Sequence, residues 1–136
     1  MKFHFLSSNN PEAKNTEKKL TKLFGQNSVE DADYIIPIGG DGLLLKSLHN
    51  FNKLNKPFFG INFGSIGFLM NNLSNENLND MIANAKKSTF KPLKMTAQSV
   101  NNEIFEAYAY NEVSLMRQTH LASKIKIKIN EKVKME

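Results

Sequence analysis

Residues 34–48 read YIIPIGGDGLLLKSL, an apolar run followed by a glycine-rich turn and an amphipathic stretch. This order predicts a buried strand over residues 34–38, a tight turn and then a helix. The glycines let the backbone approach a phosphate closely and point its N–H groups at it. The positive end of the helix favours an anion at the same place. These glycines are Gly39, Gly40 and Gly42.

Asp41 is the carboxylate within this turn. It would repel a phosphate unless it binds a metal-bound nucleotide or takes a proton from an attacking hydroxyl. The turn therefore indicates a phosphoryl-transfer site. Asp is also a common N-cap residue, so a glycine-rich turn with a capping aspartate is the alternative.

The elements around the turn predict an α/β fold. Strands are predicted over residues 3–6 and 57–61, and helices begin at Pro11 and Ser74. Strands that alternate with helices are typical of a Rossmann-like parallel sheet with helices on its faces. We therefore predict an α/β nucleotide-binding domain over residues 1–89.

From residue 90 onward, strands follow strands, as at the start of an all-β domain. The stretch IFEAYAY at residues 104–110 is one strand. The stretch KIKIK at 124–128 predicts a half-buried strand with isoleucines inside and lysines outside. The lysine row indicates a solvated face or, alternatively, a polyanion site. Asn130 and Glu131 are the predicted turn of a hairpin, and we expect an incomplete β-rich domain over 90–136.

Composition narrows the function classes. The 136 residues carry a net charge of +5 and no cysteine. The basic charge is spread lysine with Arg117 as the only arginine, so we predict no nucleic-acid partner. No stretch approaches the roughly 20 apolar residues of a membrane span, and no signal peptide is evident, so we expect a cytoplasmic protein without a membrane partner. The three histidines show no metal-ligand spacing, and no protein metal site is predicted.

A second glycine-rich loop, GINFGSIGFL at residues 60–69, follows another predicted strand. Open α/β sheets bind ligands at this edge. Asn62 can hydrogen-bond a ligand, Gly64 gives it room, and Phe68 can pack on a base or sugar. A loop that packs core aromatics is the alternative. Asn111 and Glu112 close a later strand, where an amide and a carboxylate can hold a ribose or a base edge, although such pairs are common in turns.

The chain resembles NAD kinases through these three motifs in this order and spacing. The turn at 39–42 is shared with diacylglycerol and sphingosine kinases and with phosphofructokinases. The loop at 60–69, followed by Asn111-Glu112-Val113, is more specific to NAD kinases. The resemblance covers essentially the whole chain.

The resemblance implies phosphorylation of the 2′-hydroxyl of the adenosine ribose of NAD to give NADP. ATP (or polyphosphate) would be the donor, with Mg²⁺ on its phosphates, and Asp41 would be the catalytic base. Lys46 would help to bind the dinucleotide, or is a solvated helix lysine. The implied nucleotide-binding residues are Gly39, Gly40, Asp41, Gly42, Lys46, Asn62, Gly64, Phe68, Asn111 and Glu112.

The family also has a downstream segment of the form D-G and then T-P-x-G-S-T-A-Y, which this sequence lacks. The resemblance therefore implies a fragment, inactive or impaired by itself, of an enzyme whose full-length form is a homo-oligomer. Two alternatives are a lipid kinase of the diacylglycerol type and a non-catalytic dinucleotide-binding fragment.

Overall fold

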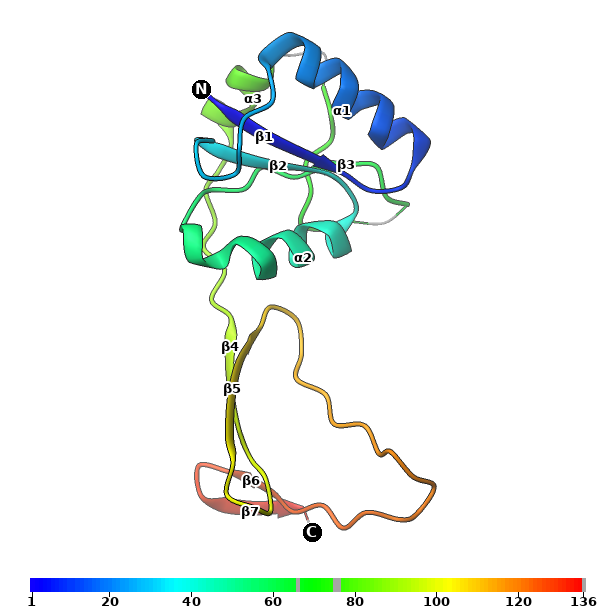
Figure 1. The fold of residues 1–136 in the computed structure, drawn as a ribbon, viewed down its shortest axis with the longest axis vertical. Coiled ribbons are helices and arrows are strands. Elements are labelled where there is room, and N and C mark those ends of the chain that lie inside the picture. Colours follow the sequence, from blue (N-terminus) through cyan, green and yellow to red (C-terminus); the bar gives the residue numbers. More distant parts are fainter. Residues whose placement is uncertain (66, 75–76, 136) are drawn as a thin grey trace.

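The computed structural model describes residues 1–65, 67–74 and 77–135. The elements of its N-terminal part are β1 (Phe3–Ser7), α1 (Pro11–Phe24), β2 (Tyr34–Gly39), α2 (Asp41–Phe51), the 3-10 turn η1 (Asn52–Leu54), β3 (Ile61–Asn62) and α3 (Leu78–Asn84). This part has three layers, with a parallel sheet in the strand order β1-β2-β3 between helices (Figure 1). α1 and α3 cover one face of this sheet and α2 covers the other (Figure 1).

Alternate side chains of the central strands divide the core between the two faces. Phe5 and Ile36 are buried in the cluster that α1 and α3 cover. The intervening residues lie on the α2 side, where the ring of His4 lies 6.1 Å from that of Phe51. Both faces are thus covered, which explains the continuous apolar run of β2.

The predicted start and end of the first helix are confirmed. Asn10 is the N-cap of α1, and its side chain accepts a hydrogen bond from the backbone N–H of Glu12 at 2.8 Å. Pro11 follows at the first helical position, where its missing N–H costs nothing. Gly25 ends the helix with a φ of +79°, a conformation that glycine adopts without a steric penalty.

The third strand differs from the prediction. Pairing with β2 begins at Pro57 and Phe59, which bond to the backbone of Ile35, but the regular strand is confined to Ile61–Asn62. The ladder is interrupted at Pro37 of β2, which has no N–H to donate to the third strand. Gly60 lies opposite this gap, and its carbonyl faces the other edge, where it accepts from the backbone N–H of Asn71 at 2.8 Å.

The last helix of this part also begins later than predicted. Asn77 has an extended backbone, and its side chain accepts from the N–H of Asn79 at 2.9 Å, so it caps a helix that starts at Leu78 and not at Ser74. Residues 75–76 of the predicted helix lie outside the described residues.

The second part is antiparallel, as predicted. β4 (Leu93–Gln98) pairs with β5 (Ile104–Ala109), and β6 (Ile127–Ile129) pairs with β7 (Lys132–Met135). Figure 1 shows both hairpins outside the three-layer part. The fold class is therefore an α/β parallel sheet followed by antiparallel strands.

The hairpin turn predicted at residues 130–131 is confirmed. Asn130 and Glu131 have φ of 48° and 63°, and two positive φ angles are typical of a type I′ turn.

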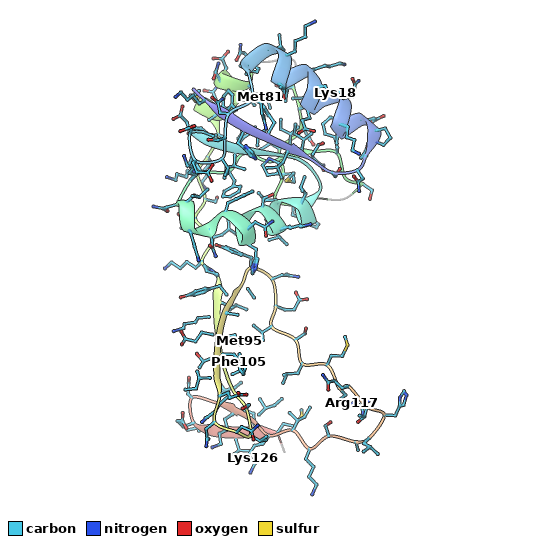
Figure 2. The ribbon with its side chains drawn as sticks, in the orientation of Figure 1. Lys18, Met81, Met95, Phe105, Arg117 and Lys126 are labelled. Atoms are coloured by element: carbon cyan, nitrogen blue, oxygen red, sulfur yellow. The ribbon has the colours of Figure 1, made fainter. Side chains whose placement is uncertain are left out.

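The prediction of a half-buried face in the KIKIK strand is wrong. Ile125, Ile127 and Ile129 are 56%, 41% and 55% exposed. A hairpin of two strands has no second layer to cover its apolar side. The apolar side chains of the β4–β5 hairpin are exposed in the same way. In Figure 2 the side chains of Met95 and Phe105 extend from it without a covering layer, and Phe105 is 56% exposed.

Within the described part of the chain, no helix has both the length and the apolar character needed to cross a membrane.

We predict that the same substitution, Ile to Ala, has a large effect on the free energy of unfolding in the three-layer part and a small one in the hairpin part. Ile36→Ala should lower the free energy of unfolding of this chain by about 2–5 kcal/mol, because it leaves a cavity in the three-layer core. Ile129→Ala should change it by less than about 0.5 kcal/mol, because its side chain is mostly in solvent. Urea unfolding measures both, and a large effect of Ile129→Ala would show that β6 is buried.

Candidate functional site

Two loops meet at the carboxyl edge of the sheet. One is the turn between β2 and α2. The other, called here the second loop, is residues 63–65 and 67–69 after β3. The backbone N–H of Phe63 donates to the carbonyl of Gly39 at 2.7 Å, which joins the start of the second loop to the end of β2. This is the edge at which open α/β sheets bind their ligands.

Asp41 joins the two loops through its side chain. Its Oδ2 accepts from the backbone N–H of Phe68 at 2.9 Å, and its Oδ1 accepts from that of Leu69 at 3.2 Å. Hydrogen bonds to an ionised carboxylate are stronger than those between neutral groups. Asp41 begins α2 after the N-cap residue Gly40, so the alternative that it caps the helix is wrong.

Asn62 and Gly67 pack beside this carboxylate. The Oδ1 of Asn62 accepts from the backbone N–H of Gly64 at 2.9 Å, which folds the second loop back on the end of β3. A Cβ on Gly67 would lie 3.1 Å from Oδ1 of Asp41 and 3.4 Å from Oδ1 of Asn62. The loop approaches the carboxylate this closely only because residue 67 has no side chain.

None of the three glycines of the first turn has a positive φ, and only Gly39 is required for space. A Cβ on Gly39 would meet Leu43 at 3.0 Å and Ser8 at 3.1 Å, so this glycine permits packing of β1, β2 and α2. A Cβ on Gly40 would lie 3.7 Å from Cα of Gly64, at ordinary contact distance. Gly42 has no atom within 4 Å of such a Cβ, so it leaves open space beside the first turn of α2.

The N-terminus of α2 has the electrostatic character expected of an anion site. Its N-cap residue is Gly40, and no side chain caps the helix. The first N–H groups of a helix have no partner within the helix, and together they carry a partial positive charge. An anion such as a phosphate can satisfy them.

The remaining predicted residues are exposed. The side chain of Phe68 is 91% exposed on the second loop. Lys46 lies on α2, one turn after Gly42, and Asn111 and Glu112 follow β5. The structure thus brings together the predicted residues of the two glycine loops, and Asn111 and Glu112 belong to the separate hairpin part.

The pairing of the hairpin tells where the chain goes after β5. Ala109 pairs with Leu93, the first residue of β4, so the residues after β5 return to where the chain leaves the three-layer part. Figure 1 shows this end of β5 nearer to α2 than the rest of the hairpin.

Sequence reasoning missed three contributors to the site. They are the backbone N–H groups of Phe68 and Leu69, the space at Gly67, and the side chain of Asn10, which donates from Nδ2 to the carbonyl of Phe63 at 3.2 Å. The spacing of Gly64 and Gly67 was the available signal for the space at Gly67. The N–H groups and the contact of Asn10 could not be found in this way, because they depend on pairings between distant residues. Ile66 of the predicted loop lies outside the described residues.

A metal site built from protein side chains is not present among the described residues, because no three His, Asp or Glu side chains gather closely enough to hold an ion.

The family model described as the ATP-NAD kinase N-terminal domain matches residues 1–89. The NAD kinase of Brucella suis is 43% identical over 133 residues, which cover 98% of this chain and 52% of that protein. The NAD kinase of Rhizobium meliloti is 40% identical over 97% of this chain and 51% of that protein. The chain therefore spans about half the length of these relatives. An NAD kinase from Archaeoglobus fulgidus, solved in complex with ATP, is 30% identical with a TM-score of 0.42, over 71% of this chain and 41% of that chain.

We predict that two glycine substitutions at the site have opposite effects on stability. Gly67→Ala should lower the free energy of unfolding by about 1–3 kcal/mol, because the added methyl group crowds the carboxylate of Asp41. Gly42→Ala should raise it by up to about 1 kcal/mol, because the methyl group enters open space and alanine favours the helix. Thermal and urea unfolding of this chain measure both, and a stable Gly67→Ala variant would contradict the packing described here.

Proposed function

The chain belongs to the NAD kinase family, and from that premise we propose that it carries the catalytic turn of an enzyme that phosphorylates NAD. ATP would transfer its γ-phosphoryl group to the 2′-hydroxyl of the adenosine ribose, which gives NADP and ADP. The observation that carries this proposal is Asp41, a carboxylate held at the opening of α2 and at the carboxyl edge of the sheet.

Asp41 is suited to accept the proton of the attacking hydroxyl. A carboxylate has about four acceptor positions on its two oxygens. The N–H groups of Phe68 and Leu69 occupy one position on each oxygen, so each oxygen keeps a second position. The two bonds fix the orientation of the carboxylate, and a base held in place needs no reorganisation when the hydroxyl arrives.

The donor phosphates fit the start of α2. Gly40 and Gly42 leave room at its first turn, and the uncapped N–H groups favour negative charge. The described residues offer no cluster of three acidic or histidine side chains for a metal ion, so we propose that Mg²⁺ is held mainly by the phosphates of ATP. Mg²⁺ bound in this way neutralises charge on the phosphates.

The acceptor NAD would contact both parts of the chain. We propose that the exposed ring of Phe68 packs on a base or sugar, and that Asn62, Gly64 and Lys46 line the same side. Asn111 and Glu112 would contact the nucleoside from the hairpin, whose pairing returns them toward the three-layer part.

We also propose the finer features of the whole protein. Residues 1–89 would be the nucleotide-binding domain, and residues 90–136 the first part of a β-rich domain that completes the NAD site. The full-length protein would be a cytoplasmic homo-oligomer whose ligands are NAD and ATP, with neither a nucleic acid nor a membrane as a partner.

The test of this proposal is Asp41→Asn in the full-length protein that carries this chain. NADP formation from NAD and Mg-ATP should fall by about 10²–10⁴-fold in kcat, because asparagine cannot take the proton. Asp80→Asn, the same change in the first turn of α3 and outside the two glycine loops, serves as the matched control and should keep full activity. An unchanged rate in Asp41→Asn would exclude this residue as the base. Phosphorylation of diacylglycerol in vesicles in place of NAD would favour a lipid kinase.

We further predict that Phe68→Ala separates binding from stability. The ring is 91% exposed, so its removal should change the free energy of unfolding by less than about 0.5 kcal/mol. The KM for NAD should rise by about 2- to 12-fold, which corresponds to the 0.5–1.5 kcal/mol of an aromatic stacking contact. Steady-state kinetics of the full-length protein measure this, and an unchanged KM would place the ring outside the NAD site.

A further inference from the structure

Asn10 connects the cap of α1 to the second loop through one side-chain amide. Its Oδ1 accepts from the backbone N–H of Glu12 at 2.8 Å, which is the capping bond. Its Nδ2 donates to the carbonyl oxygen of Phe63 at 3.2 Å, 53 residues along the chain. The oxygen of the amide is therefore bonded within α1, and its nitrogen is bonded to the second loop.

These two contacts fix which way the amide points. The N–H of Glu12 requires an acceptor opposite it, and the carbonyl of Phe63 requires a donor. An ionised Asp supplies no donor, and the hydroxyl of Ser or Thr would have to accept and donate through a single atom, whereas Asn10 contacts Glu12 and Phe63 through two different atoms. Asparagine suits this position because it caps the helix with its oxygen and donates from a separate nitrogen.

Phe63, whose carbonyl accepts from Asn10, also joins the second loop to β2. Phe63 donates its N–H to Gly39 and accepts from Asn10, so its peptide groups are held by both β–α turns. The same loop ends at the N–H groups of Phe68 and Leu69, which orient the carboxylate of Asp41. Phe63 and the two N–H groups that orient Asp41 therefore belong to the same loop.

We propose that Asn10 is a positioning residue of the phosphoryl-transfer site. It holds the second loop against the carboxyl edge of the sheet and, through that loop, sets the orientation of Asp41. This role rests on the proposed function for its effect on turnover, but its effect on the loop is independent of that function.

Two variants isolate the role of the Nδ2 donor. Asn10→Asp and Asn10→Ser each keep an oxygen that caps α1, and each loses the bond to Phe63. The matched control is Asn77→Asp, which makes the same change at the cap of α3, where Oδ1 of Asn77 accepts from the N–H of Asn79. Unfolding by urea should show that all three variants keep a folded three-layer part.

Hydrogen exchange of this chain, followed by mass spectrometry over residues 62–70, is the first measurement. Loss of one hydrogen bond of about 0.5–1.5 kcal/mol should speed exchange of this peptide by about 2- to 12-fold in both Asn10 variants. The control should leave it unchanged. Unchanged exchange in the Asn10 variants, or an equal increase in Asn77→Asp, would overturn the proposal.

The second measurement is NADP formation by the full-length protein. We expect the Asn10 variants to lower kcat by about 3- to 30-fold with a smaller change in the KM for ATP, because the base is misplaced while the phosphate site persists. Faster exchange with an unchanged kcat would make Asn10 a structural cap only. If instead Asp41→Asn keeps full turnover, Asp41 is not the base, and if the full-length protein forms no NADP at all, the proposed function fails. In both cases the exchange result for Asn10 stands.

Discussion

The contact between the carboxylate of Asp41 and two backbone N–H groups of the second loop is the constraint on which the site depends. It spans 27 residues to Phe68 and 28 to Leu69, and it joins segments that the sheet brings to one edge without joining them itself. The carboxylate is thus both a structural tie and the proposed base. The two roles are compatible because the tie uses one acceptor position of each oxygen and leaves the others free.

Close approach, more than unusual backbone conformation, explains the glycines around this contact. Gly25, at the end of α1, has a positive φ, whereas Gly39, Gly40 and Gly42 do not. Gly39 permits the packing of β1 against α2, and Gly67 permits the second loop to reach the carboxylate. Among the glycines of the turn at 39–42, Gly42 has open space where a Cβ would lie, and a Cβ on Gly40 would be at ordinary contact distance from Gly64. This turn therefore combines one position required for packing, Gly39, with one that leaves space, Gly42.

The sequence predicted the three-layer fold because its signals are local. The apolar run of β2, the N-cap at Asn10 and the stop at Gly25 depend on neighbouring residues. The late start of α3 and the short β3 were mispredicted because their boundaries depend on the capping bond of Asn77 and on the missing N–H of Pro37 in the neighbouring strand, which periodicity does not reveal. At the site, the residue types were visible in the motifs. The bonds that join them were not, because they connect residues 27 to 53 positions apart.

The two parts of the chain differ in how much of their apolar surface is buried, and this difference affects the proposed site. The parallel sheet is buried on both faces, so its carboxyl edge is a rigid base for Asp41 and the second loop. The β4–β5 hairpin pairs Lys94 with Glu106 at 2.8 Å across its polar face, while Leu93 and Phe105 on the other face are 53% and 56% exposed. Its strand register returns the chain after Ala109 to Leu93, where β4 begins. An NAD bound between the two would therefore be oriented by the rigid sheet edge, and contact with Asn111 and Glu112 would require the hairpin to be held beside it.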